Sequence, residues 1–465
     1  MKIQNFTVIF AALITVAGCG GGGGGGSSAP SPTPVAAAPT ITMASNVAKI
    51  KAGSSATLTW TSTNATSCSA SNGWSGTQAI SGASTQSPTS NTSYTLTCSG
   101  AGGSVNQTVS LIVPIPVQKS SYLNAKNINI NQQTLPVVDP TFFEQIQNGY
   151  AFADFFQNGT MSLVAFTDNI PADGTTPTTA GKVHFFEKDA TGAWQDKTTS
   201  MLDTNVGCIT PRKLIVADFN NDGIPDVFAS CHGYDGTPYP GESPHVLLSQ
   251  PDGTYKNITL TINCFCHGAT AADLNGDGNI DIVVADMRGQ GGKTPIYALM
   301  GDGKGGFTID YNRVDRPEYE YKNAYWSVEA IQSATAGQYN LLVGGSEPIG
   351  SASGTTTQMI YGDATGNFVN TPVMNLPSVT NYETVMDFVA EGQYIYSLRV
   401  LTSPYYGGNA IQKIDTNTGI GTVIYSHTGT YGNYLKFPAT WFSWMIPFNG
   451  NLVSENGFYN VSVPQ

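Results

Sequence analysis

A turn motif that recurs six times between residues 150 and 465 constrains the fold of this sequence more than any other feature. Each copy ends in a glycine, and the spacings are 64, 55, 59, 55 and 58 residues between Gly159, Gly223, Gly278, Gly337, Gly392 and Gly450. A short apolar segment follows each copy, and a second glycine turn recurs between copies, as at residues 189–192 and 251–253. Each period therefore holds two hairpins, or four strands. Four-stranded units at this spacing predict a β-propeller.

The number of turns indicates how such a ring would close. Six first hairpins are present but only five second ones, and the chain stops soon after Gly450. Strands from residues 120–148, ahead of the first repeat, can supply the missing outer pair. We therefore expect an all-β protein with a propeller over residues 117–465, in which six blades are favoured and seven are the alternative.

Two copies of the motif carry oxygen-bearing side chains at alternate positions. Residues 218–226 read D-x-N-x-D-G-x-x-D, and residues 273–281 repeat the pattern. Ca²⁺ takes about six to eight oxygen ligands, and these side chains converge if the loop curls, which the glycine at position 6 permits. A turn whose side chains bond only its own backbone is the alternative. The expected ligands of the first loop are Asp218, Asn220, Asp222, Ile224 and Asp226, and those of the second are Asp273, Asn275, Asp277, Asn279 and Asp281. Ile224 and Asn279, at position 7, would contribute their backbone carbonyl oxygens.

These segments resemble the FG-GAP/VCBS repeats of integrin α-subunit heads and bacterial surface propellers. The resemblance spans residues 117–465 and is strong in the two loops just described. It implies two structural Ca²⁺ ions that make their blades rigid and take no part in chemistry. The copy at Asp154 has Phe156 at position 3 and Ser162 at position 9, so we expect no ion there. The last three copies lack the acidic residues.

The N-terminus has the features of an export signal. A charged start precedes an apolar stretch over residues 6–16, which is too short to span a bilayer. The sequence Val-Ala-Gly-Cys ending at Cys19 resembles the bacterial lipobox, which implies cleavage after residue 18 and lipid attachment to the Cys19 thiol. An ordinary signal peptide with an incidental cysteine is the alternative. Gly20 follows, so retention in the inner membrane is not signalled, and we expect a lipid-anchored protein of the bacterial outer membrane, facing the periplasm or exposed at the surface.

Between this signal and the propeller, two further regions are expected. Residues 19–39 contain seven consecutive glycines and then a Ser/Pro/Ala-rich stretch, which is typical of a tether without a core. Residues 40–116 contain alternating segments such as 56–60 and 94–98, separated by turns. They resemble bacterial immunoglobulin-like modules, which implies a small β-sandwich. It serves as a spacer or, alternatively, as an adhesive module.

Six cysteines remain for disulfides in an oxidising compartment. Cys68 and Cys98 form the economical pair within the small domain. The other four allow three connectivities, and we favour bridges from the Cys264/Cys266 segment to Cys208 or Cys231, because a ring closed by C-x-C is strained. A zinc site at Cys264, Cys266 and the neighbouring His267 is a minor alternative.

Composition excludes one class of partner. The net charge is −12, so the chain lacks the basic surface that nucleic-acid binding needs. Neither a G-x-S-x-G nor an H-E-x-x-H motif is present, and the five histidines are scattered, so we assign no catalytic residue.

The loops on the face opposite the calcium loops are long and aromatic, which favours recognition of an extracellular glycan or protein. His232 and His267 are expected to meet near the channel mouth. For the tryptophans, the alternative to ligand binding is that they fill the core of the channel. The candidate ligand-binding residues are His232, Tyr234, His267, Arg288, Tyr325, Trp326, Trp441 and Trp444. A surface-anchored, calcium-stabilised binding or adhesion lipoprotein is the favoured function. The alternatives are a polysaccharide-active lyase or hydrolase and a structural component of the envelope.

Overall fold

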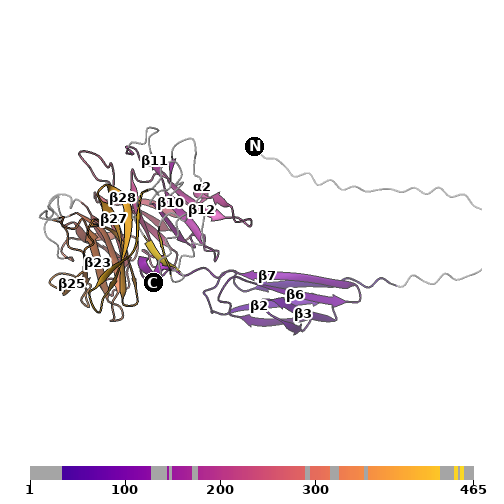
Figure 1. Ribbon diagram of the computed structural model, residues 1–465. Coiled ribbons are helices and arrows are strands. Elements are labelled where there is room, and N and C mark those ends of the chain that lie inside the picture. Colours follow the sequence, from indigo (N-terminus) through magenta and orange to yellow (C-terminus); the bar gives the residue numbers. More distant parts are fainter. Residues whose placement is uncertain are drawn as a thin grey trace, which may run out of the picture.

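The computed structural model describes residues 34–126, 144–145, 149–169, 176–287, 294–314, 324–349, 354–429, 445–448 and 451–454. These residues form a small domain of two sheets followed by a larger ring of sheets (Figure 1). Strands dominate both parts, so the all-β prediction is confirmed. Within the described residues, no helix is long and apolar enough to cross a membrane.

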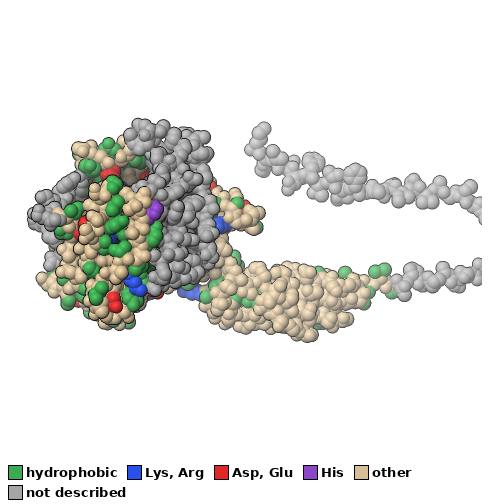
Figure 2. Space-filling view, viewed as in Figure 1, with side chains coloured by type: hydrophobic (Ala, Val, Ile, Leu, Met, Phe, Trp, Pro, Cys, Tyr) green, Lys and Arg blue, Asp and Glu red, His purple; other side chains and the backbone are tan. Residues whose placement is uncertain are grey.

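The small domain packs two antiparallel sheets around one core. Its strands bury alternate residues, as in the segment Leu58 to Trp60 and in the segment Tyr94 to Cys98, which is the alternation that the sequence predicts. Lys49 and Lys51 are the only charged residues between positions 40 and 111, and the surface of this domain in Figure 2 is mostly tan, the colour of the backbone and of side chains that are neither hydrophobic nor charged. One sheet has the order β1 (Thr40–Ser45), β2 (Ala56–Thr63), β5 (Ser81–Gln86), and the other β4 (Gly76–Gln78), β3 (Ser67–Asn72), β6 (Thr92–Gly100), β7 (Gly103–Leu111).

The larger part has a β-propeller-like fold. Five antiparallel sheets have four strands each in simple meander order, and a sixth hairpin follows them. The sheets are β9 (Tyr150–Ala153), β10 (Ser162–Phe166), β12 (Val183–Lys188), β13 (Trp194–Asp196); β14 (Pro211–Ala217), β15 (Asp226–Cys231), β16 (His245–Ser249), β17 (Tyr255–Thr259); β18 (Cys266–Ala272), β19 (Asp281–Asp286), β20 (Ile296–Gly301), β21 (Phe307–Asp310); β22 (Tyr325–Gln332), β23 (Tyr339–Gly345), β24 (Gln358–Tyr361), β25 (Val373–Asn375); and β26 (Thr384–Glu391), β27 (Tyr394–Thr402), β28 (Tyr405–Asp415), β29 (Gly421–Thr428). The hairpin joins β30 (Met445–Phe448) to β31 (Asn451–Ser454), and this part also contains the short elements β11 (Asp168–Asn169) and α2 (Thr198–Met201).

The first strands of successive sheets lie side by side and form the inner wall of the ring. Contacts run from β9 through β14, β18, β22 and β26 to β30. Ile446 of β30 then packs in one cluster with Tyr150 and Phe152 of β9, so the last hairpin meets the first sheet. Neighbouring sheets cover both faces of these strands, and β18, for example, is buried at all seven residues. This burial explains why inner strands read as apolar runs rather than as alternating patterns.

The described part of residues 120–148, which were expected to supply the missing outer strands, adds no strand to the β30–β31 hairpin, and residues 127–143 and 146–148 lie outside the described residues. Residues 121–126 do not form an outer strand but the helix α1 (Ser121–Lys126), and β8 (Glu144–Gln145) pairs with β11 instead of β31. Polar side chains explain the position of α1, because they bond to the ends of inner strands. Asn124 Nδ2 donates to Val216 O at 2.8 Å, and Ala271 N donates to Ser121 Oγ at 2.8 Å. The helix therefore contacts β14, β18, β22 and β30 inside the ring.

All six described cysteines form disulfides, which are typical of proteins that fold outside the cytoplasm. Cys68 pairs with Cys98, as expected. The favoured connection of the Cys264/Cys266 segment to Cys208 or Cys231 is wrong, because the structure pairs Cys208 with Cys231 and Cys264 with Cys266. Register explains the first of these pairs. Pro211 lies opposite Cys231 in the β14–β15 hairpin, which brings Cys208, three residues before Pro211, beside the end of β15.

Candidate binding face and cation loops

The two predicted calcium loops connect the inner hairpins of adjacent sheets, one between β14 and β15 and the other between β18 and β19. Both curl in the same way. Gly223 N donates to Asp218 Oδ2 at 2.8 Å, and Gly278 N donates to Asp273 Oδ2 at 3.0 Å. Gly223 has a φ of 82°, which a side chain would oppose. We call this end of the ring the cation-loop face.

The acidic residue at position 9 of each loop has a structural role of its own. Asp226 Oδ2 accepts a hydrogen bond from Phe219 N at 2.7 Å, and its Oδ1 accepts one from Ser249 N at 2.7 Å. Asp281 repeats this arrangement with Leu274 N and Gly301 N, at 3.1 and 2.9 Å. These carboxylates hold the loop to the third strand of the sheet, which the spacing of acids in the sequence did not reveal.

Acidic side chains lie close together in both loops, and their proximity affects their pKa values. Burial, followed by nearby Asp222, raises the pKa of Asp226 to about 7, although hydrogen bonds oppose the shift. Burial also raises the pKa of Asp281 to about 6, with further increases from Asp277 and Asp273. Asp273 Oδ1 is buried and has no hydrogen-bond partner among the described residues. A carboxylate oxygen in this state fits a cation ligand, so the residues present are compatible with Ca²⁺.

In the first copy of the loop, the side chains at positions 1 and 9 form hydrogen bonds with backbone N–H groups. Asp154 is 1% exposed and accepts backbone hydrogen bonds from Asn158 at 2.9 Å, Gly159 at 2.8 Å and Ile115 at 2.9 Å. Ser162 Oγ accepts from Phe155 N at 3.0 Å, in the place that an aspartate takes in the other two loops. This loop faces the small domain, whose Asn91 Nδ2 donates to Asn158 O at 2.7 Å.

The opposite face contains a bulge at the same place in four successive inner strands. The register shifts between Pro211 and Leu214, Cys266 and Gly268, Tyr325 and Ser327, and Val385 and Asp387. A bulge leaves a residue outside the ladder and redirects its side chain. The residues so released are Arg212 with Lys213, His267, Trp326 and Met386.

Arg212, His267 and Trp326 belong with His232 and Phe265 to what we call the mouth cluster. The ring of His267 lies 4.4 Å from that of Trp326 and 5.8 Å from that of His232, whose ring is 3.5 Å from Phe265. The two histidines therefore lie close together at the channel end. Both are buried, at 1% and 5% exposure, while Trp326 is half-buried and donates from Nε1 to Ser346 Oγ at 2.9 Å.

The other predicted ligand residues are distributed differently. Tyr325 is buried at 3% exposure within the core between the third and fourth sheets, which matches a packing role. Tyr234 is half-buried in the loop that follows β15. Arg288, Trp441 and Trp444 lie outside the described residues.

Two polar atoms of the mouth cluster are buried without a hydrogen-bond partner in the part of the chain that the structure describes. They are Arg212 Nε and His267 Nε2. Both residues line one small cavity of about 10 Å³, together with Lys213, Gly268, Ser327, Met386 and Asp387. A cavity of this size admits about one water-sized group. The mouth therefore offers polar groups that a small polar atom of a ligand or a water molecule can satisfy.

Two carboxyl groups near this end of the ring have shifted pKa values, and one of them, Asp168, interacts with Arg212. Burial raises the pKa of Asp168 to about 7, although Arg212 opposes this shift. Burial also raises the pKa of Glu242 to about 7, even though its oxygens accept hydrogen bonds from Ile209 N at 2.9 and 3.0 Å. The pKa of His267 is held well below its usual value, first by burial and then by Arg212. Sequence motifs identified none of Arg212, Asp168 and Glu242, and the available signal was only the charged pair Arg212–Lys213 within an apolar strand.

Below the mouth, charged residues occupy the interior of the ring. Lys213 Nζ bonds to Glu329 Oε2 and to Asp387 Oδ1, each at 2.9 Å. Burial alone would lower the pKa of Lys213, but the carboxylates of Asp387 and Glu329 raise it. Helix α1 lies beyond this cluster, and a cavity of about 70 Å³ separates them. The polar contacts of α1 hold it in place, with Tyr122 Oη donating to Ala390 O and Lys126 paired with Glu391.

Comparisons with known proteins give only distant similarity. No protein-family model matches the sequence. No curated protein is similar to it in sequence. Among solved structures, a quinonprotein alcohol dehydrogenase-like protein of Bacteroides thetaiotaomicron has 9% identity and a TM-score of 0.29, covering 82% of this chain and 93% of that protein. The Vibrio cholerae biofilm matrix protein Bap1 has 14% identity and a TM-score of 0.34, covering 65% of this chain and 42% of Bap1. The NanB sialidase of Streptococcus pneumoniae, as its K499G mutant, has 10% identity and a TM-score of 0.28, covering 78% and 64%. With TM-scores below 0.5, none of these likenesses identifies a family or a function for this chain.

Proposed function

We propose that this chain is a surface-anchored, calcium-stabilised binding or adhesion lipoprotein that recognises an extracellular glycan or protein through the mouth cluster and the loops around it. The observation that carries the proposal is the repeated bulge, which directs Arg212, His267 and Trp326 from three adjacent sheets to one place. Bulges that redirect side chains are common beside functional sites. Aromatic and arginine side chains around unsatisfied polar atoms are the groups that recognition sites use.

The ring and its ions provide the rigid support for this face. Six inner hairpins in a closed ring favour six blades of FG-GAP/VCBS type. Two Ca²⁺ ions, one in each acidic loop, would hold the opposite face without contact with the ligand. The buried, unpartnered Asp273 Oδ1 supports the second of these ions.

The position in the cell follows from the N-terminal segment, which lies outside the described residues. In this proposal, Cys19 carries the lipid, residues 19–39 are the tether and the sandwich is a spacer. Cys19→Ala should abolish lipid attachment, and the protein should leave the membrane fraction or stay unprocessed. Unchanged recovery of this variant in membranes would contradict the lipid anchor.

A glycan array, probed with the full chain in calcium and in chelator, tests recognition. We expect binding to a defined subset of extracellular polysaccharides, weaker in chelator, and retained by the matched variants Arg313→Ala and Trp194→Ala, whose side chains lie away from the mouth. If the chain binds no glycan on the array and no surface protein in a parallel panel, the result contradicts the binding function and favours a structural role in the envelope.

An enzyme acting on polysaccharide is the second candidate, and the raised pKa values of Asp168 and Glu242 favour it. Carboxyl groups with a pKa near 7 are suited to proton transfer, although burial alone also produces such shifts. Each array ligand should be incubated with the protein and assayed for new reducing ends and for unsaturated products. Cleavage that is lost in Asp168→Asn or Glu242→Gln would establish the enzyme, whereas intact ligand supports binding alone.

A further inference from the structure

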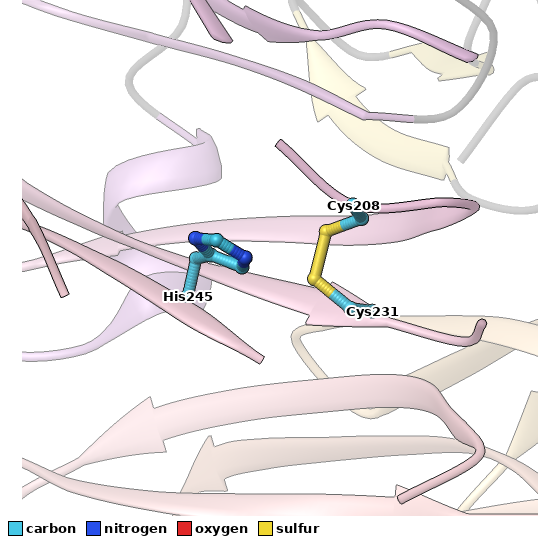
Figure 3. Close-up of side chains that lie close together, drawn as sticks. All are labelled: Cys208, Cys231 and His245. Atoms are coloured by element: carbon cyan, nitrogen blue, oxygen red, sulfur yellow. A yellow bond between two sulfur atoms is a disulfide. The ribbon is translucent and has the colours of Figure 1, made fainter. Parts of the chain in front are cut away.

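Three potential metal ligands lie together in the second sheet, away from the acidic loops. One ligand atom from each of Cys208, Cys231 and His245 lies within 4.8 Å of the other two. Cys231 ends β15, His245 begins β16 opposite Ala229, and Cys208 precedes β14. Figure 3 shows the His245 ring with one nitrogen toward the disulfide. The same strand register that forms the disulfide thus places an imidazole next to both sulfurs.

The orientation of His245 is fixed by a second residue. Asn257 Nδ2 donates to Thr204 O at 3.1 Å and to Val206 O at 2.7 Å, so its Oδ1 is the atom that faces the imidazole. His245 Nδ1 lies 2.7 Å from this Oδ1 and must donate to it. Nε2 therefore carries the free lone pair. A histidine that donates one N–H to a fixed acceptor while the other nitrogen stays available is the usual arrangement of a metal ligand.

The surroundings favour a neutral complex. Both sulfurs are fully buried in the cluster that contains Phe166, Val183 and Leu247. Two thiolates and one divalent ion have no net charge, so such a complex avoids most of the cost of placing a charge in an apolar core.

We propose that Cys208, Cys231 and His245 form a redox-dependent site for a borderline-soft divalent metal ion such as Zn²⁺. The disulfide is one state of this site, and the metal complex is the other. A dithiol reductant transfers two electrons to the disulfide, its own two thiols become a disulfide, and their protons pass to Cys208 and Cys231. Binding of M²⁺ then displaces both thiol protons to solvent, and a water molecule completes four ligands with the two sulfurs and His245 Nε2.

Cobalt(II) is the probe for a direct test on the full chain. The protein is reduced with dithiothreitol until thiol titration shows that all disulfides are open, freed of reductant under anaerobic conditions, and titrated with Co²⁺ and then Zn²⁺. We expect one Co²⁺ per chain with thiolate charge-transfer bands and the d–d bands of tetrahedral geometry, displaced by Zn²⁺. The oxidised chain should show neither. If the reduced chain is folded and shows none of these bands, the proposal is overturned. If the reduced chain has lost its melting transition, the proposal is overturned when the bands are absent and Zn²⁺ does not restore that transition.

Variants separate this site from the other cysteines. Cys264→Ser/Cys266→Ser should bind Co²⁺ as the wild type does, and so should His184→Gln, which alters a histidine paired with Asp196 in the first sheet. His245→Gln should lose the tetrahedral spectrum, and Asn257→Ala should weaken binding about tenfold or more because Nδ1 loses its fixed acceptor. A spectrum that disappears in the Cys264/Cys266 variant, or persists in His245→Gln, would place the ion elsewhere and overturn the assignment.

Discussion

Asp154 Oδ2 accepts a hydrogen bond of 2.9 Å from the backbone N–H of Ile115, which joins the first repeat of the ring to the segment that leaves the small domain. The loop has kept the first aspartate of the calcium pattern but uses it for backbone donors. The residue proposed to bind an ion in two copies of the repeat thus stabilises a connection between domains in another copy.

Asp154→Ala should destabilise the ring without any dependence on calcium. The substitution removes a buried acceptor of three backbone N–H groups, and we expect a loss of about 2–4 kcal/mol in the free energy of unfolding. Chemical denaturation in calcium and in chelator measures this loss. Asp363→Ala is the control, because its carboxylate accepts similar bonds in an exposed turn, and its effect should be clearly smaller. Equal effects of the two variants would show that the Ile115 contact adds nothing.

Asp222→Ala and Asp277→Ala should each lower the melting temperature in calcium, and the difference should vanish in chelator. An ion that binds only the folded loop stabilises it by RT ln(1 + [Ca²⁺]/Kd), which is about 1.4 kcal/mol at ten times Kd. Asn158→Ala, in the degenerate first loop, should show no calcium dependence. The loops touch through Asn221 Nδ2 and Asn279 Oδ1, 2.9 Å apart, so the two losses need not add. Wild-type protein that melts identically in millimolar calcium and in chelator would show that both loops are turns without ions.

The stability of the ring should fall as the pH rises toward neutrality, partly through Glu242. Its pKa is about 7 in the folded chain, against 4.5 for an unperturbed glutamate. Between these values the folded state holds a proton that the unfolded state has lost, so this contribution is complete below pH ~4.5 and is lost as the pH approaches 7. Glu242→Gln should therefore be more stable than wild type at pH 8, by about 1–3 kcal/mol, and the gap should close near pH 4.5. Urea denaturation at several pH values measures it, and a gap that does not depend on pH would contradict the shifted pKa.

Removal of the Cys68–Cys98 bridge should affect the small domain alone. The bridge closes a loop with a sequence separation of 30 residues, and its loss should cost about 2–4 kcal/mol in that domain. Calorimetry of Cys68→Ala/Cys98→Ala should show a lowered transition for the small domain and an unchanged one for the ring. A single transition that shifts as a whole would mean that the two parts unfold together.

Local features of this protein were predictable from sequence, whereas contacts across the ring were not. The loops at Asp218 and Asp273 are visible because their Asp and Asn residues lie within nine positions of one another. The Cys68–Cys98 pair follows from a domain with two cysteines. By contrast, the meeting of Arg212, His267 and Trp326 depends on bulges in three strands that are adjacent only once the ring has formed. A bulge leaves no sequence signal at these positions, since polar and aromatic residues there also fit an ordinary strand.

Helix α1 and the cysteine pairing show the same limit. Ser121–Lys126 is too short for a helical pattern, and the acceptors that hold it belong to strands about 90 to 270 residues away, such as Val216 at a separation of 92 and Ala390 at 268. Local geometry disfavours a Cys264–Cys266 pair, because a ring closed by C-x-C is strained, and yet the structure contains this pair. The favoured alternative fails because Cys208 lies three residues before Pro211, the partner of Cys231 in the β14–β15 hairpin, and pairs with Cys231 there.

The most direct test of the account measures binding of an array-selected glycan, or of the surface protein found in its place, to the wild type and to Arg212→Ala and Trp326→Ala by titration calorimetry in calcium. We predict that each mouth variant weakens binding at least about tenfold, which corresponds to about 1.4 kcal/mol, and that Arg313→Ala and Trp194→Ala bind as the wild type does. Melting curves must show that the variants remain folded. Binding that is unchanged in both folded mouth variants would contradict the assignment of this face as the recognition site.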